Sequence, residues 1–136
     1  MRTVVTRLRP GQDLEGELLA LAERERIQAG WVLTCVGSLS RATLRLAGAT
    51  RRRTADGALE IVALAGTIAR QGSHLHLAVA DHRGATVGGH LLGGCLVRTT
   101  AEVVLGASGR LRFDREHDPE TGYRELVVRH PEEGPR

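Results

Sequence analysis

The stretch GSHLHLAVADHRGATVGGH, residues 72–90, predicts a β-hairpin. Apolar runs stand on both sides of the turn DHRG at 81–84, which fits a three-residue hairpin loop with Gly84 in the left-handed conformation. Closing the hairpin there pairs Asp81 with Ala85 and sets the register of the two strands. A two-residue turn would instead shift that register by one residue and move the side chains of one strand to the other face.

This register places three histidines on one face of the hairpin. His74 and His76 are two residues apart, so the alternation of a strand puts both on the same side. Counting outward from the turn, His90 lies opposite His76, and directly opposed Cβ atoms are ~4.5–5.5 Å apart. Three imidazoles so placed can bind one Zn²⁺ ion at ~2.0–2.1 Å and leave a fourth position open.

We therefore predict a metal site at His74, His76 and His90, with zinc as the expected ion. Ni²⁺, Fe²⁺ and Cu²⁺ also accept imidazole ligands, and the sequence does not separate them from zinc. The alternative is that each histidine is a core or surface residue satisfied by its own hydrogen bond. An open site with three protein ligands is more typical of catalysis or ligand binding than of a structural metal.

The remaining histidines are interpreted as surface residues, and the glycines before His90 leave several roles open. His82 lies in the turn, His117 in a polar loop and His130 near the end of the chain, and we expect all three at the surface. Gly88 and Gly89 allow close approach of the backbone to a ligand, or form a bulge or a subunit contact.

Outward from the hairpin, the sequence predicts one helix and several further strands. Asp13 can cap a helix over residues 13–28, whose leucines recur at helical spacing. Strands are expected at residues 2–8, 31–39, 43–46, 58–69, 95–105, 111–115 and 125–130, with polar loops at 47–57 and 116–122. This pattern is typical of an α+β fold with a largely antiparallel or mixed sheet and one main N-terminal helix. We expect a single domain over residues 1–131 and a frayed tail over 132–136.

The composition of the chain restricts its function further. The 136 residues carry a formal net charge of +3 and only 2% aromatic residues, so no platform for stacking nucleic-acid bases is evident. Cys35 and Cys95 lie in apolar runs without CxxC spacing, and we expect small buried thiols. No run is apolar and long enough to span a bilayer, and no signal-peptide pattern is present, so we expect a cytoplasmic protein without a membrane partner.

Five segments in a fixed order resemble a known family. They are VGSLSRATLRL (36–46), GALEIVALAGTI (57–68), HLHLAVAD (74–81), GATVGGHL (84–91) and TAEVVL (100–105). Together they resemble the PPC (plant and prokaryote conserved) domain, in its prokaryotic stand-alone type, over about residues 2–130. The resemblance implies a compact α+β fold that assembles into a homotrimer. It also implies that members with His-x-His and Gly-Gly-His hold a metal there, which here means His74, His76 and His90.

The DNA-binding label of this family transfers weakly to the chain. Land-plant members join the domain to an AT-hook that contacts DNA, and no Arg-Gly-Arg-Pro motif is present here. Arg51 to Arg53 form a basic triplet in a predicted loop, which we interpret as solvated.

Three functions are compatible with these residues. The first is a homotrimeric binding or regulatory module that uses the metal for structure or for a small-molecule ligand. The second is a zinc-dependent lyase or hydrolase, since the fold is similar to that of acetolactate decarboxylase, which also uses three histidines. Such an enzyme needs a carboxylate near the metal, and Glu60 and Glu102 are the candidates on predicted strands, although the registers do not bring either to the histidines. The third is direct DNA binding, which needs a continuous arginine face. We expect the first.

Overall fold

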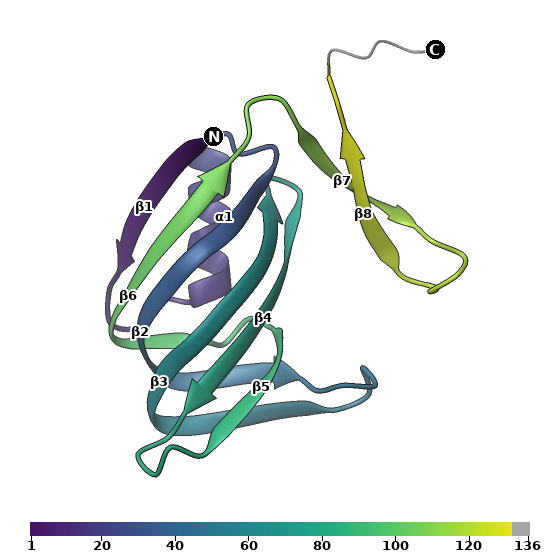
Figure 1. Cartoon of the computed structure of the whole chain (residues 1–136). Helices are drawn as coiled ribbons and strands as arrows, with labels where there is room; N and C mark the ends of the chain where they lie inside the picture. The colour runs from purple at the N-terminus through teal and green to yellow at the C-terminus, as the bar shows by residue number, and fades with distance from the viewer. Residues whose placement is uncertain (132–136) are drawn as a thin grey trace.

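The computed structural model describes residues 1–131, and the tail predicted at 132–136 lies outside them. The elements are β1 (Arg2–Leu8), α1 (Leu14–Arg24), β2 (Gly30–Arg45), β3 (Arg52–Ala69), β4 (Gly72–Ala80), β5 (Thr86–Leu91), β6 (Leu96–Ala107), β7 (Arg112–His117) and β8 (Arg124–Arg129). Six strands form one sheet in the order β1-β6-β2-β3-β4-β5, with all neighbours antiparallel (Figure 1). The predicted α+β fold with a largely antiparallel sheet is therefore correct.

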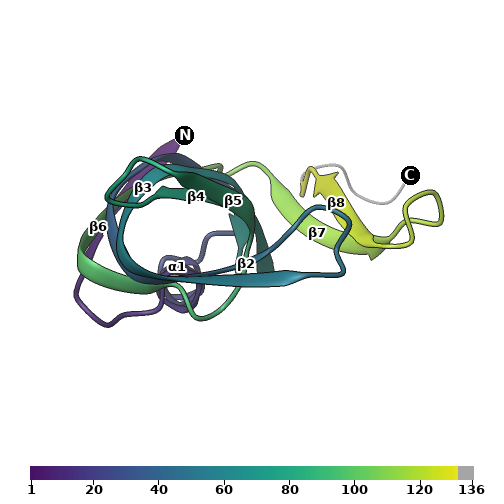
Figure 2. The same cartoon turned by 90° about the horizontal axis from the view of Figure 1, so that it is seen from below.

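The six-stranded sheet curls until β2 meets β5. Leu44 and Arg45 of β2 pair with Leu91 and His90 of β5, although β2 also pairs with β3 and β6. Seen end-on, the strands form a ring with α1 at its edge (Figure 2). A strand of 16 residues is long enough to serve different neighbours along its length in a strongly coiled sheet. This closure brings Arg45 next to His90.

Aliphatic side chains fill the inside of the curled sheet, as the small number of aromatic residues requires. The buried face of α1 contributes Leu14, Leu18, Leu21 and Ala22. The helix ends at Arg24, earlier than predicted, because Arg26 adopts a φ of 54° and the chain turns to bury Ile27. No helix in residues 1–131 combines the length and the apolar character that crossing a membrane requires.

Asp13 caps α1 and also ties the helix to the sheet. One carboxylate oxygen accepts a hydrogen bond from the N–H of Gly16 at 2.8 Å, which is the predicted N-cap. The other oxygen accepts from the N–H of Gly94 at 2.7 Å, in the segment that precedes β6. Asp13 therefore fixes where the helix starts and where it sits against the sheet.

The predicted boundaries of two elements were wrong. Residues 31–39 and 43–46 belong to one continuous strand, β2, whose register shifts between Leu39 and Arg41. The predicted loop at 47–57 is shorter, because β3 already begins at Arg52. The first residues of β3 are polar and mostly exposed, and such residues look like a loop in the sequence.

The two cysteines are free thiols, as expected. Cys95 is buried and its sulfur accepts a hydrogen bond from the N–H of Thr43 at 3.2 Å. Cys35 is only half-buried, yet burial, reinforced by the charge of Glu102, raises the pKa of its thiol to about 11. Both thiols therefore stay protonated at neutral pH and act as packing groups.

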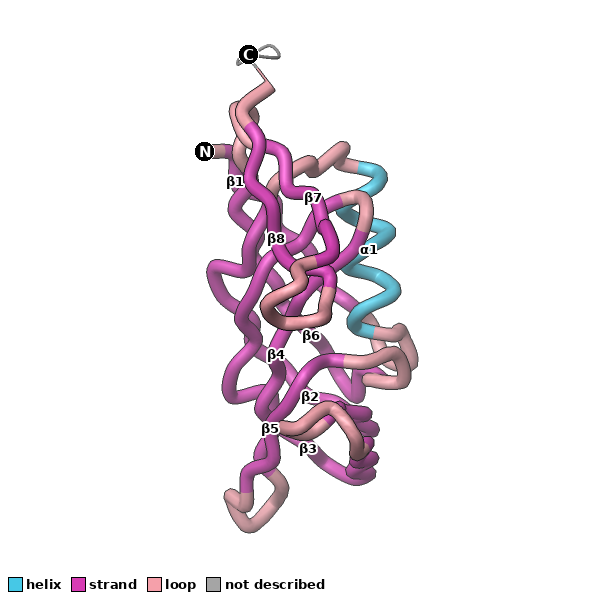
Figure 3. Tube along the Cα trace, turned by 90° about the vertical axis from the view of Figure 1, so that its right-hand side faces the viewer, coloured by secondary structure: helices cyan, strands magenta, loops and turns pink. Residues whose placement is uncertain are grey.

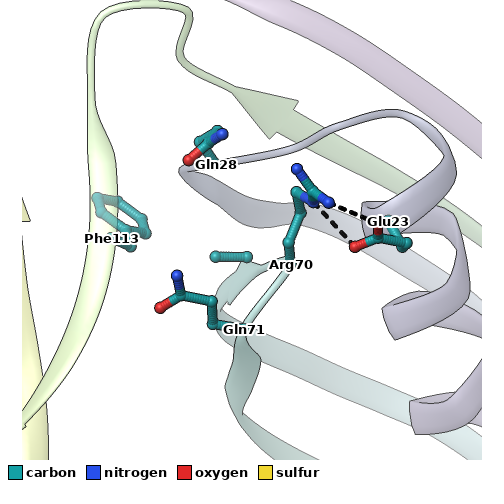
Figure 4. A pocket seen from close by; sticks show the side chains of 6 residues that line it. Glu23, Gln28, Arg70, Gln71 and Phe113 are labelled. Atoms are coloured by element: carbon teal, nitrogen blue, oxygen red, sulfur yellow. Dashed lines mark hydrogen bonds and ion pairs between the residues drawn. The ribbon is translucent and has the colours of Figure 1, made fainter. Parts of the chain in front are cut away.

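The hairpin of β7 and β8 stands apart from the ring of strands (Figure 1), and a side view shows it in front of the sheet (Figure 3). The N–H of Phe113 donates to the backbone oxygen of Gln28 at 2.9 Å and holds the start of the hairpin. At this junction, a pocket between Phe113 and Gln28 is bordered by an ion pair of Arg70 with Glu23 (Figure 4). The hairpin thus reaches from the connection between α1 and β2 along the outside of the sheet.

Candidate metal centre

The hairpin of β4 and β5 has the predicted register. The N–H of Asp81 donates to the oxygen of Ala85 at 2.9 Å, and Gly84 has the left-handed φ of 79°. The Asp81 carboxylate also accepts from the N–H of Ala85 at 3.0 Å, so the side chain stabilises the loop. As a result, His76 and His90 are directly opposed across the two strands.

The structure brings the three predicted ligands together on the outer face of the sheet. Leu75 and Leu77 point into the core, so His74 and His76 point away from it. The ring centroids of the three histidines are 5.1, 5.3 and 5.9 Å apart. One nitrogen from each ring lies within 4.8 Å of the other two.

The chemistry of this cluster fits an imidazole-binding metal. Among the described residues, Nδ1 of His90 is a buried polar atom without a hydrogen-bond partner. Tetrahedral zinc ligands at ~2.0–2.1 Å from the ion are ~3.3 Å from one another, so the three nitrogens would have to approach one another by up to about 1.5 Å to bind one ion. His74 and His76 are exposed and leave one side of the cluster open.

The surroundings lower the pKa of two of the three imidazoles, those of His74 and His90, and so favour the neutral form that a metal would need. Partial burial lowers the pKa of His90, and the charge of Arg45 lowers it further. Partial burial also lowers the pKa of His74, helped by Arg115 and opposed by the carboxylate of Glu125. A neutral imidazole retains the lone pair that binds a metal.

The cluster lies in a groove of about 930 Å³ on the outside of the sheet. The walls come from β4, β5, the β2–β3 loop and the β7–β8 hairpin. Besides the histidines, the groove is lined by Arg45, Leu46, Ala47, Gly48, Ala49, Gln71, Gly72, Ser73, Gly88, Gly89, Arg115, Tyr123, Arg124 and Glu125. Several segments distant in sequence thus surround the three histidines.

Several of these lining residues were not found from the sequence. Arg115 and Glu125 lie on β7 and β8, and no local pattern in that polar region indicates that the hairpin borders the histidines. Arg45 reaches His90 only through the β2–β5 closure. To place Arg45 beside His90 from the sequence, one would have had to predict that β2 pairs with β5.

The two carboxylates considered from the sequence lie elsewhere. Glu60 is opposite Ser38 and Ala80, and Glu102 is opposite Arg7 and Val36. Neither of them lines the groove, whereas Glu125 does.

The other predicted surface residues are exposed, and Gly89 has a structural role. His82, His117 and His130 are all exposed and outside the cluster, although His117 ends β7 rather than lying in a loop. A Cβ atom on Gly89 would lie 2.6 Å from the backbone oxygen of Arg45. Gly89 therefore permits the close approach of β2 and β5.

Comparison with known proteins identifies the family of this chain. Residues 1–108 match the Plants and Prokaryotes Conserved (PCC) domain, which is the PPC domain under another abbreviation. The bifunctional protein GlmU of Synechococcus sp. (strain JA-2-3B'a(2-13)) is 57% identical over 122 residues, which are 90% of this chain and 19% of that protein. The GlmU of Synechococcus sp. (strain JA-3-3Ab) is 54% identical over 128 residues, or 94% and 21%. The chain therefore spans about a fifth of the length of these curated relatives.

Solved structures share the whole architecture. A hypothetical protein from Salmonella cholerae-suis is 39% identical with a TM-score of 0.93, over 96% of this chain and 94% of that one. A protein from Ralstonia eutropha JMP134 with a provisional DNA-binding designation is 29% identical with a TM-score of 0.76, over 90% and 89%. A metal-containing protein from Archaeoglobus fulgidus, 23% identical with a TM-score of 0.80 over 93% and 94%, shares the fold. The chain belongs to the Plants and Prokaryotes Conserved domain family.

Proposed function

We propose that this protein is a cytoplasmic homotrimeric binding module that holds one transition metal, of the zinc type, at His74, His76 and His90. The observation that carries the proposal is the convergence of three imidazole nitrogens within 4.8 Å on one face. The unpartnered Nδ1 of His90 supports it, because a buried nitrogen without a partner costs stability unless something binds it. The Archaeoglobus fulgidus protein of the same fold, which is described as metal-containing, supports it too.

The ligand set favours zinc but also suits other divalent first-row transition metals. All three donors are imidazole nitrogens, which suit Zn²⁺, Ni²⁺, Cu²⁺ and Fe²⁺ better than Mg²⁺ or Ca²⁺. A bound divalent ion would supply a Lewis acid at the floor of the groove. The chain itself would supply the walls that select a small ligand.

Metal content of purified, untagged protein tests the site. We expect about one metal ion per chain in the wild type and a loss of it in His76→Ala, because two imidazoles hold zinc weakly. His82→Ala is the matched control, since His82 is an exposed histidine of the same hairpin. The proposal is wrong if zinc reconstitution loads no protein, or if His76→Ala retains as much metal as His82→Ala.

The trimer is supported by three exposed valines on the outer face of the sheet. Val5, Val36 and Val62 are 68%, 55% and 55% exposed, on three strands that lie near one another in the sheet. Exposed apolar surface of this kind favours contact with another protein surface, here further copies of the chain.

Sedimentation analysis tests the trimer. We expect three protomers for the wild type and one for Val36→Asp, because a buried unpaired carboxylate opposes association. Val128→Asp, on the exposed face of β8 and away from these three valines, should remain a trimer. A monomeric wild type would contradict the proposal.

A zinc-dependent lyase or hydrolase is the second candidate, and Glu125 favours it. This carboxylate lines the groove together with the histidines, where it could accept or donate a proton. The test is turnover of carbonyl substrates by the wild type and by Glu125→Gln. Turnover that is lost in the variant at unchanged metal content would favour an enzyme over a binding module.

DNA binding is a third candidate, supported by the designation of the Ralstonia eutropha protein. It predicts retention on heparin and a steep dependence of affinity on salt.

A further inference from the structure

The groove around the histidines carries an excess of positive charge. Three guanidinium groups line it, from Arg45, Arg115 and Arg124, against one carboxylate, from Glu125. Within residues 1–131, other arginines such as Arg70 form ion pairs, but none of these three has a carboxylate oxygen within ion-pair distance. Their charges are therefore available to an external anion.

Arg45 occupies one flank of the cluster. It is the direct partner of His90 across β2 and β5, and Arg52 is its direct partner across β2 and β3. Neighbouring strands are ~4.8 Å apart, so two arginine side chains leave the sheet on the same face beside the histidine. Such a pair destabilises a sheet, and an anion near it would relieve the repulsion.

Arg115 occupies the opposite flank and is held in place. One of its nitrogens donates to the hydroxyl oxygen of Thr67 at 2.9 Å, and Thr67 is the cross-strand partner of His74. Arg124 donates to the backbone oxygen of Arg115 at 2.6 Å, which further fixes β7 and β8 at this point. The remaining N–H groups of the Arg115 fork are left to bind a ligand.

We propose that the groove binds a small molecule through a carboxylate or phosphate group held between Arg45 and Arg115. Planar guanidinium groups bind both kinds of oxyanion with two parallel hydrogen bonds. The groove volume of about 930 Å³ suits a molecule of metabolite size. The proposal rests on the function proposed above, because this anion would be the ligand of the metal-binding module.

Calorimetric titration tests the anion site on zinc-loaded and on metal-free protein. The probes are inorganic phosphate and succinate, with glycerol as a neutral control. We expect Arg45→Gln and Arg115→Gln each to weaken anion binding about tenfold or more, the loss typical of one charge-assisted contact. Arg83→Gln is the matched control: it removes an exposed arginine of the β4–β5 turn that does not line the groove, and it should bind like the wild type. Zinc content should be equal in all four proteins.

The outcomes separate this proposal from the metal site. Equal affinity of all four proteins, or no binding of either probe by zinc-loaded protein, overturns the anion site and leaves the metal site standing. Arginine-dependent binding by protein that takes up no zinc supports the anion site and overturns the metal site. Binding of duplex DNA alone, with a steep salt dependence and no affinity for the small probes, also overturns the anion site.

Discussion

Gly89→Ala should damage the proposed metal centre without changing any of the three histidines. The added Cβ would lie 2.6 Å from the backbone oxygen of Arg45, about 0.8 Å short of the 3.4 Å at which ordinary contact begins. Backbone cannot rotate away as a side chain can, so β5 must move away from β2. Because His90 is the next residue, it moves together with β5.

Overpacking of this kind typically costs about 1–3 kcal/mol, which corresponds to a fall of about 4–12 °C in the melting temperature of a domain of this size. We also expect zinc affinity to fall about tenfold, the lower end of the losses seen when supports of metal ligands are disturbed. Thermal unfolding followed by circular dichroism measures the first effect on metal-free protein. Competition with a chromophoric chelator measures the second.

Gly88→Ala is the matched control for this prediction. Its Cβ would meet the oxygen of Leu77 at 3.2 Å, a contact that a shift of a few tenths of an ångström relieves. We expect its melting temperature and zinc affinity to stay near those of the wild type. If Gly89→Ala behaves like Gly88→Ala in both assays, the closure of β2 on β5 does not position His90 as we argue.

Two further predictions concern the helix cap and the thiol. Asp13→Ala should lower the free energy of unfolding by about 2 kcal/mol, since it removes the hydrogen bonds from Gly16 and Gly94. Asp13→Asn keeps one side-chain oxygen and should lower it less. Urea denaturation measures both losses, and equal losses would contradict the role of the two oxygens. Burial raises the pKa of Cys35 to about 11, so the thiolate is scarce at neutral pH. The rate of its alkylation, followed by peptide mass spectrometry, should therefore keep rising up to about pH 10. A plateau of that rate near pH 8.5 would contradict this.

The histidine cluster could be predicted because its information is local. The turn at 81–84 sets the register of β4 and β5, and strand alternation then places all three histidines on one face. Loop length and glycine position decide such a turn, and both can be read from four consecutive residues. The helix start at Asp13 was predictable for the same reason.

The rest of the groove could not be predicted because it depends on contacts between distant segments. Arg45 meets His90 only when the sheet curls, and the sequence of β2 carries no sign of a third neighbour. Arg115 reaches Thr67 of β3 because the β7–β8 hairpin crosses outside the sheet, and a polar hairpin gives no apolar pattern that indicates its direction. The matched family segment also ends at residue 108, before this hairpin begins.

The short span of the histidine hairpin has a consequence for the order of folding. His74 and His90 meet when a hairpin closes, an event of ~1–10 μs, whereas Arg2 of β1 must find Ala107 of β6 across most of the chain. Closing the larger loop costs more entropy, so the β1 pairing forms later. A nascent chain that has left the ribosome only as far as β5 would therefore present all three imidazoles. At that stage β1 would still lack β6, its partner in the sheet.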